Sequence, residues 1–205
     1  MKKTAAEISN LLIIIFELIS FAFLIRKNGG VTSGVFIYYT RLSNLLALIA
    51  GILVLIFILR HKSGILPKWL TILRYIATIM LTITLLISLF VLSPAVGSFY
   101  RMMIADQLKF HHLLCPLISI VSFIFFEKGE KLSIKDNFLS TLPTLIYGII
   151  MLILNAAYVL RGPYPFLLVY EQPVWATILW IAGIYSGTFL IGYVLRVLNG
   201  HSKRG

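Results

Sequence analysis

The chain has 205 residues, of which 60% are hydrophobic, and its 18 Lys and Arg residues against 7 Asp and Glu give a net charge of +11. So much apolar surface excludes an ordinary soluble domain. The basic residues stand between long apolar runs and form no soluble basic domain, which excludes a nucleic-acid-binding protein.

Six apolar runs are long enough to cross a bilayer as helices, which takes roughly 17–25 residues each. They cover residues 8–25, 37–59, 69–92, 109–126, 138–160 and 174–198. Because lipid offers the backbone no hydrogen-bond partners and the runs are far longer than barrel strands, we expect α-helices. The sequence therefore predicts an all-α polytopic membrane protein, with one six-helix transmembrane domain over residues 1–205.

The basic residues gather on one side of these six runs. The richer side holds Lys2, Lys3, Arg60, Lys62, Lys68, Lys128, Lys131, Lys135, Arg196, Lys203 and Arg204. The other side holds Arg26, Lys27, Arg101, Lys109 and Arg161. By the positive-inside rule, both termini are predicted to be cytoplasmic in the plasma (cell inner) membrane. We expect the basic surplus to contact anionic membrane lipids.

The first run follows Met1-Lys2-Lys3 and imitates a signal peptide, but it is too long, contains Glu17 and ends without a cleavage site. Glu17 is expected near the middle of the membrane, where an ionisable residue indicates function. It can carry a proton or pair with a buried basic residue such as Arg41 or Arg74. The alternative is a neutral carboxyl that forms an interhelical hydrogen bond.

Thr40, Ser43 and Asn44 open the second run on one face of the predicted helix. A hydroxyl such as that of Thr40 commonly bonds back to a helix carbonyl, which is the alternative to a functional role. Asn44 on the same face favours a functional role, because an amide in lipid needs a partner. The adjacent Tyr38 and Tyr39 fit an interfacial aromatic belt or a substrate entrance.

The third run carries Thr71, Thr78 and Thr82 at helical spacing, which is typical of packing between membrane helices. The longest outward loop follows it, at about residues 93–108, beside the polar residues of the second run.

The fourth run opens with His111 and His112. A neutral imidazole can accept a proton from a hydroxyl near neutral pH, which makes histidine the usual general base. Neighbouring helical residues point about 100° apart, so we expect only one histidine to face the bundle. His112 is favoured, because it shares a small and polar stripe with Cys115, Ser119 and Ser122. The alternative is a pair of interfacial histidines.

Two other roles for this run are weaker. Cys115 is a rival nucleophile, but a buried cysteine in an apolar helix is usually inert. Two adjacent histidines without matching carboxylates lack the usual ligand spacing, so no metal site is expected.

Asn155, Tyr158 and Arg161 close the fifth run, and the first two share a helical face. Arg161 can hold a carboxylate or phosphate headgroup, or it can be an ordinary snorkelling anchor. The following turn, Arg161-Gly162-Pro163-Tyr164-Pro165-Phe166, is stiff and aromatic. The sixth run contains Gly183-xxx-Gly187, a close-packing pattern that can serve packing within the bundle.

These polar residues are predicted to converge at one surface of the bilayer. In an up-and-down bundle, even-numbered runs begin and odd-numbered runs end on the same face. Thr40 and Asn44, the two histidines, and the Asn155–Arg161 segment therefore meet at the outward face. Polar groups in hydrocarbon are costly, so this cluster is a candidate functional site.

The chain resembles the small six-helix membrane proteins related to the androgen-induced-gene and androgen-dependent TFPI-regulating proteins, especially their prokaryotic relatives. The resemblance covers nearly the whole chain in segment order. Its pieces are Tyr39-Thr40-Arg41-Leu42-Ser43-Asn44, His111-His112 with Pro116 behind them, and Tyr147 to Tyr158 followed by Arg161-Gly162-Pro163-Tyr164-Pro165-Phe166. The last piece is the most specific.

Animal members of that family are hydrolases that cleave fatty acid esters of hydroxy fatty acids with an intramembrane threonine nucleophile and a histidine. The resemblance implies Thr40 as the nucleophile and His112 as the histidine, with His111 as the alternative. The remaining site residues follow from this mechanism: Asn44, Asn155 and Tyr158 as oxyanion or substrate contacts, and Arg41 and Arg161 as headgroup contacts. No cofactor is needed.

The expected function is therefore an intramembrane Thr/His-dependent hydrolase whose partners are membrane lipids and a fatty-acyl ester substrate. One alternative is a small transporter or proton-coupled channel component that uses Glu17 and the histidines. Another is a non-catalytic scaffold or lipid-binding protein, in which Thr40, Asn44 and His112 only tie helices together.

Overall fold

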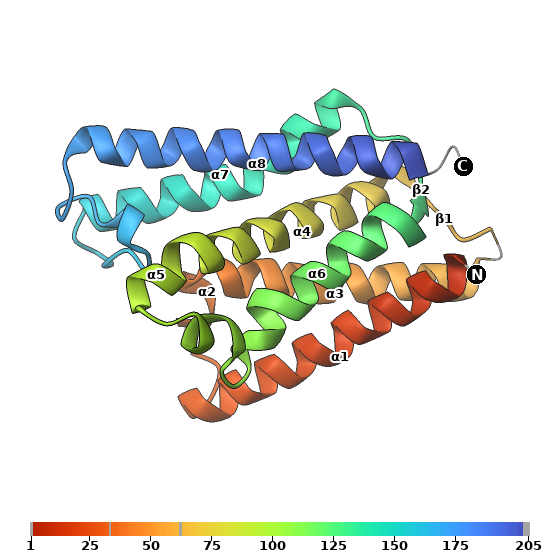
Figure 1. Ribbon diagram of the computed structural model, residues 1–205, viewed down its shortest axis with the longest axis horizontal. Coiled ribbons are helices and arrows are strands. Elements are labelled where there is room, and N and C mark those ends of the chain that lie inside the picture. Colours follow the sequence, from red (N-terminus) through yellow and green to blue (C-terminus); the bar gives the residue numbers. More distant parts are fainter. Residues whose placement is uncertain (1, 33, 62, 203–205) are drawn as a thin grey trace.

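The computed structural model describes residues 2–32, 34–61 and 63–202 as a bundle of antiparallel helices (Figure 1). The long helices are α1 (Lys2–Asn28), α3 (Tyr39–Arg60), α4 (Lys68–Ile87), α7 (Ile134–Ala156) and α8 (Val174–Ser202). Between α4 and α7, the chain runs back along the bundle through η3 (Phe110–Leu114), α6 (Cys115–Val121) and η4 (Ser122–Phe126). The shorter elements are α2 (Gly34–Ile37), β1 (Ile65–Leu66), η1 (Ser88–Leu92), α5 (Ser93–Val96), η2 (Tyr100–Ile104), β2 (Lys128–Gly129) and η5 (Pro165–Leu167).

The sequence predicts an all-α protein, and the structure is nearly all-α, with β1 and β2 as two-residue strands. Within the described ranges, five helices are long and apolar enough to cross a membrane, which is compatible with an integral membrane protein. They are Lys2–Asn28, Tyr39–Arg60, Lys68–Val96, Ile134–Ala156 and Val174–Gly200. The segment Phe110–Phe126, at the place of the fourth predicted run, is apolar but shorter.

The start of α1 and the end of α8 lie at the same end of the bundle as β1 and β2 (Figure 1), and we call this the terminal end. The opposite end, with the connections 29–38, 97–109 and 157–173, is the distal end. Of the basic residues of the richer side, those that the structure describes belong to segments at the terminal end (Figure 1). Lys62, Lys203 and Arg204 lie outside the described residues.

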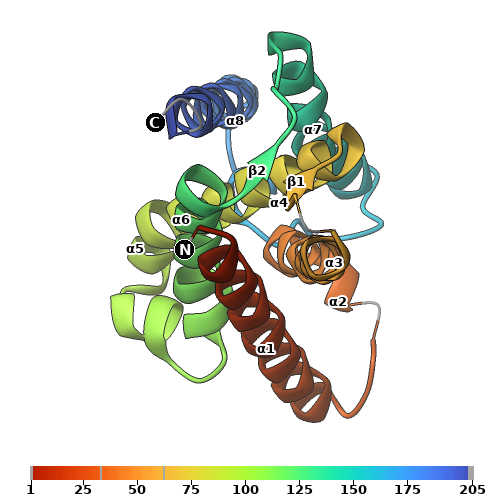
Figure 2. The same cartoon turned by 90° about the vertical axis from the view of Figure 1, so that its right-hand side faces the viewer.

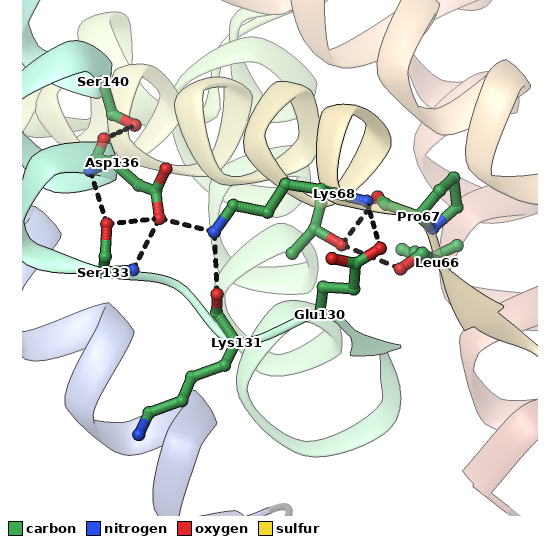
Figure 3. Close-up of polar contacts among 9 residues, drawn as sticks. Leu66, Pro67, Lys68, Glu130, Lys131, Ser133, Asp136 and Ser140 are labelled. Carbon is green, nitrogen blue, oxygen red and sulfur yellow. Dashed lines mark hydrogen bonds and ion pairs between the residues drawn. The ribbon is translucent and has the colours of Figure 1, made fainter.

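The loops at the terminal end are joined to each other (Figure 3). β1 and β2 pair in parallel, which connects the α3–α4 loop to the η4–α7 loop. Lys68 donates from Nζ to the carbonyl of Lys131 at 2.7 Å and pairs with Asp136 Oδ2 at 2.6 Å. Its backbone N–H donates to Glu130 Oε1 at 3.0 Å. These bonds fix where α4 and α7 begin.

The fifth predicted run, 138–160, is displaced toward the terminal end in the structure. α7 begins at Ile134 because Ser133 and Asp136 form a capping box, in which each side chain accepts from the other's backbone N–H. It ends at Ala156, and Tyr158 then takes a left-handed conformation with φ 56°. The chain therefore leaves the helix after Asn155 but before Tyr158 and Arg161, which were also expected to close it.

α4 is the central helix of the bundle. Figure 2 shows α1 and α3 on one side of it and α7 and α8 on the other. In the most apolar stretch of the span that contains α4, 56% of the residues are buried inside the protein. The corresponding share for α8 is only 17%. A buried salt bridge anchors α4 to the end of η4, because Arg74 Nε lies 2.9 Å and 3.0 Å from the two carboxylate oxygens of Glu127.

Candidate functional site

Thr40, Arg41, His111 and His112 line one cavity of about 390 Å³ at the distal end, together with Tyr38 and Tyr164. We call it the distal cavity. It lies where the start of α3, the η3 segment and the turn after α7 meet. The structure thus brings together Thr40, the nucleophile proposed from the sequence, with both histidines and one of the two candidate arginines.

Thr40 lies in the first turn of α3 and is almost fully buried. Its backbone N–H donates to Tyr164 Oη at 3.2 Å, and its carbonyl accepts from Ser43 Oγ at 2.9 Å. The hydroxyl that bonds back to a helix carbonyl here is therefore that of Ser43. Within the described residues, no hydrogen bond joins the Thr40 side chain to a histidine, although all three side chains line the same cavity.

His111 and His112 are both buried and both line the distal cavity, so the expectation that only one would face inward is wrong. The reason is packing on two sides of η3: His111 faces Glu17 of α1, and His112 faces the carbonyl of Met102 in η2. Residues 110–114 also form a π-helical turn, a feature frequent at functional sites.

The hydrogen bond of His112 determines which of its nitrogens can act as a base. His112 Nδ1 lies 2.7 Å from the carbonyl oxygen of Met102. A carbonyl only accepts, so Nδ1 carries the proton, and the Nε2 lone pair of the neutral ring is left to take a proton.

Glu17 lies beside His111. The His111 Nε2 is 3.0 Å from Glu17 Oε2, and both side chains are buried, so the buried basic residue next to Glu17 is His111 rather than Arg41 or Arg74. Lateral packing decides this, because α1 lies against η3 and α6. Glu17 of α1 therefore orients the His111 ring.

Asn44 holds two of the cavity-lining segments together through backbone hydrogen bonds. Its Nδ2 donates to the carbonyls of Thr40, at 2.5 Å, and His111, at 3.3 Å, so it ties α3 to η3. Asn44 is fully buried and is not among the residues that line the distal cavity.

Arg41 supplies a positive charge at the cavity wall. Its Nη1 donates to the carbonyl of Gly34 at 2.6 Å, and its guanidinium lies 4.4 Å from the centre of the Tyr38 ring. These contacts hold the guanidinium in place and leave further N–H groups for an anionic or carbonyl oxygen.

A second, apolar cavity adjoins the first. This slot, of about 70 Å³, lies between α3, α4, α7 and α8, and its walls include Ile83, Gly148, Leu152 and Ile184. Thr40 and Tyr164 line both the slot and the distal cavity. Thr40 therefore stands where a polar space meets a narrow apolar one.

Tyr164 is a candidate site residue that the sequence did not single out. Burial raises the pKa of its hydroxyl, so the group stays protonated and can donate a hydrogen bond. The turn that carries it depends on Gly162, where a Cβ would lie 2.7 Å from Cβ of Leu167. Tyr164 belongs to the stiff aromatic turn noted after the fifth run, but the sequence of that turn does not show in which direction the ring points.

Asn155, Tyr158 and Arg161 line a separate cavity of about 260 Å³ and not the distal cavity. Asn155 bonds the backbone of Leu160 and Val169, at 3.3 Å and 2.9 Å. Tyr158 stacks on Tyr170, and Arg161 pairs with Glu171 at 2.8 Å, both on the surface. The early end of α7 directs these three residues away from Thr40.

Within the described part of the chain, no group of three or more His, Cys, Asp and Glu side chains could hold a metal ion. No protein-family model, curated protein or solved structure matches the chain.

Proposed function

We propose that this protein is an integral membrane hydrolase that cleaves fatty-acyl esters, with Thr40 as the nucleophile and His112 as the general base. The observation that carries the proposal is the position of Thr40, which lines both the distal cavity and the apolar slot. A fatty-acyl ester has a matching shape, because its apolar hydrocarbon chain is attached to the polar carbonyl group at which the bond is broken. The slot would take the acyl chain and the distal cavity the rest of the substrate.

In the first step, Thr40 Oγ1 attacks the ester carbonyl while His112 Nε2 takes the hydroxyl proton. The new Oγ1–C bond leaves a tetrahedral oxyanion. As the oxyanion collapses, the ester C–O bond breaks and the leaving alkoxide receives the proton from His112. In the second step, His112 activates water, which releases the fatty acid and restores Thr40. The proposed reaction uses no cofactor.

The oxyanion needs hydrogen-bond donors placed in advance. Tyr164 Oη already accepts from the Thr40 backbone N–H, so its own proton is available to donate toward the cavity. Arg41 is a second donor at the cavity wall. We assign these roles to Tyr164 and Arg41 in place of Asn44, Asn155 and Tyr158.

His112 is preferred to His111 as the base because of what each ring already contacts. The Met102 carbonyl keeps His112 in the tautomer that accepts at Nε2. His111 directs Nε2 to Glu17 Oε2 at 3.0 Å, so that nitrogen is already engaged and does not face Thr40. In an unliganded site, a nucleophile and its base commonly lack a close hydrogen bond that forms only with substrate bound.

We further propose that the chain crosses the plasma membrane six times with both termini in the cytoplasm. The terminal end then faces the cytoplasm and the distal cavity faces outward. The supporting observation is the charge asymmetry, since the basic segments sit at the terminal end.

The test uses purified protein in detergent, a fluorophosphonate probe and long-chain p-nitrophenyl esters. Wild type should be labelled and should hydrolyse the esters, and Thr40→Ala and His112→Ala should each lose both activities by at least about a hundredfold. Thr188→Ala is the matched control, because Thr188 is a buried threonine of α8 that lines neither cavity. An inert wild type, or a Thr40→Ala protein as active as wild type, would overturn the proposal.

One observation favours proton-coupled transport as a second candidate. Glu17 and His111 form a buried acid–base pair: His111 lines the distal cavity, and Glu17 lies far from either end of α1. Proteoliposomes with a pH-sensitive dye inside test it. Proton entry under an imposed potential should exceed that of protein-free vesicles and disappear in Glu17→Gln, while Glu7→Gln should retain it. Equal fluxes with and without protein would exclude this function.

A further inference from the structure

A cavity at the terminal end, opposite the distal cavity, carries a strong positive charge. It has a volume of about 350 Å³, and Lys2, Lys3 and Lys128 line it together with Ser63 and Gly64. Its other wall is apolar and consists of Ala6, Ile58 and Phe126. We call it the lysine cavity. We propose that it binds the phosphate group of an anionic ligand.

Three segments far apart in the sequence bring the lysines together. Lys2 and Lys3 are the first residues of α1, and Lys128 belongs to β2. The pairing of Lys128 with Ile65 places β2 next to the turn at Gly64. The Lys3 side chain packs against that turn. Its Nζ donates to the carbonyl of His61 at 3.4 Å, and its methylene groups lie beside Gly64.

Among the described residues that line the lysine cavity, none is Asp or Glu, so no acidic side chain in these walls offsets the charges of Lys3 and Lys128. Glu127 is the sequence neighbour of Lys128, but it is buried and engaged by Arg74. The first turn of α1 has no acidic residue either, so the partial positive charge of the helix terminus adds to that of the lysines.

The cavity also offers hydroxyl chemistry suited to an oxyanion. Ser63 Oγ accepts from the backbone N–H of Ile65 at 3.4 Å, which leaves the hydroxyl proton to be donated. Ammonium groups with one hydroxyl donor match the oxygens of a phosphate better than those of a neutral headgroup.

The apolar wall indicates where such a phosphate can come from. Ala6 and Ile58 lie one turn from the ends of α1 and α3, and Phe126 ends η4, so the cavity sits where apolar helices give way to basic loops. An anionic phospholipid could place its headgroup among the lysines and its chains along the helices. A free phosphate would use the same lysines without the apolar wall.

The experiment titrates purified full-length protein in detergent with three probes and follows the melting temperature. The probes are short-chain phosphatidylglycerol, short-chain phosphatidylcholine and inorganic phosphate. Phosphatidylglycerol should raise the melting temperature saturably, and phosphatidylcholine should not. The apparent Kd for phosphatidylglycerol should rise about fivefold in Lys3→Gln or Lys128→Gln, and more than tenfold in the double variant.

Lys135→Gln is the matched control. Lys135 is an exposed lysine in the first turn of α7, at the same end of the bundle but outside the cavity, and the variant loses the same charge. Its Kd should stay within about twofold of wild type. A response to inorganic phosphate that the double variant loses would assign the site to free phosphate, and a response to phosphatidylglycerol alone would assign it to a lipid headgroup. Equal weakening by Lys135→Gln, or equal binding of phosphatidylcholine, would overturn the proposal.

Discussion

Arg74 and Glu127 form a salt bridge inside the bundle, with Arg74 Nε 2.9 Å and 3.0 Å from the carboxylate oxygens and with both side chains almost fully buried. Asn10 and Ser122 also donate to the same carboxylate, at 3.0 Å and 2.8 Å. One acidic group therefore joins α1, α4 and η4. Taking these charges out of water is costly, and the network compensates that cost only while every member is present.

Glu127→Gln is accordingly expected to lower the free energy of unfolding by about 3–5 kcal/mol, because it leaves the Arg74 charge buried without a counter-charge. Denaturant titration in mild detergent, followed by circular dichroism, measures this. Replacing both partners, as Arg74→Met with Glu127→Leu, should recover much of the loss. Glu171→Gln breaks the exposed pair with Arg161 and should change stability little. If Glu127→Gln and Glu171→Gln behaved alike, the buried pair would not hold the bundle together.

Tyr164→Phe tests the hydroxyl that reaches the backbone of Thr40. Loss of an oxyanion donor should lower kcat for ester hydrolysis by about 10²–10³-fold with little change in KM. Phe keeps the ring and its stacking on Phe166, whose centre lies 5.2 Å away, so the fold should be preserved. A rise in KM at constant kcat would instead indicate that Tyr164 only binds the substrate.

The pH dependence of stability follows from the same residue. The pKa of Tyr164 is raised by burial, so the folded protein favours the protonated hydroxyl more than the unfolded chain does. Its contribution is fully present below the unfolded pKa of about 10 and is lost as the pH rises above that value. The stability of wild type should therefore decline relative to that of Tyr164→Phe above about pH 10. Parallel curves from pH 7 to 11 would contradict this.

The sequence predicted the helical runs because apolar length is a local property. The fourth run, expected at 109–126, matches the segment Phe110–Phe126 closely. The pairing of charges was not predictable in this way. Glu127 reads as the first residue of a basic loop, yet it points back to Arg74. Glu17 pairs with His111 because α1 packs beside η3. The hydrophobic pattern of a single run does not show which helices lie side by side.

The candidate site was predicted in part for a similar reason. Thr40 and the two histidines meet because each opens a run at the distal end, so topology alone is sufficient. Asn155 was expected there by the same rule, but its position depends on where α7 ends, and the left-handed Tyr158 changes the path of the chain. Helix ends depend on caps and turns of a few residues, which hydrophobic length does not determine.

Gly162→Ala should disturb the turn that positions Tyr164. The added Cβ would lie 2.7 Å from Leu167 Cβ and 2.9 Å from its backbone oxygen, so the turn must shift. We expect a loss of about 1–3 kcal/mol in stability and a parallel fall in esterase activity. Gly183→Ala is the control, because nothing lies within 4 Å of the Cβ it would add. It should be neutral or slightly stabilising in α8. Equal melting temperatures for the two variants would contradict the steric argument.

The acyl-chain assignment of the apolar slot is tested by filling the slot from Gly148. This glycine of α7 lines the slot, and a Cβ added there would have no atom within 4 Å, so a larger side chain has room to enter. Gly148→Phe should lower kcat/KM for p-nitrophenyl palmitate by at least about tenfold and leave p-nitrophenyl acetate within about twofold, because only the long chain needs the slot. Gly183→Phe adds the same side chain to an open position of α8 and should leave both rates unchanged. Equal loss with both esters would mean that the substitution damages the catalytic residues, and no loss with either would place the acyl chain outside the slot.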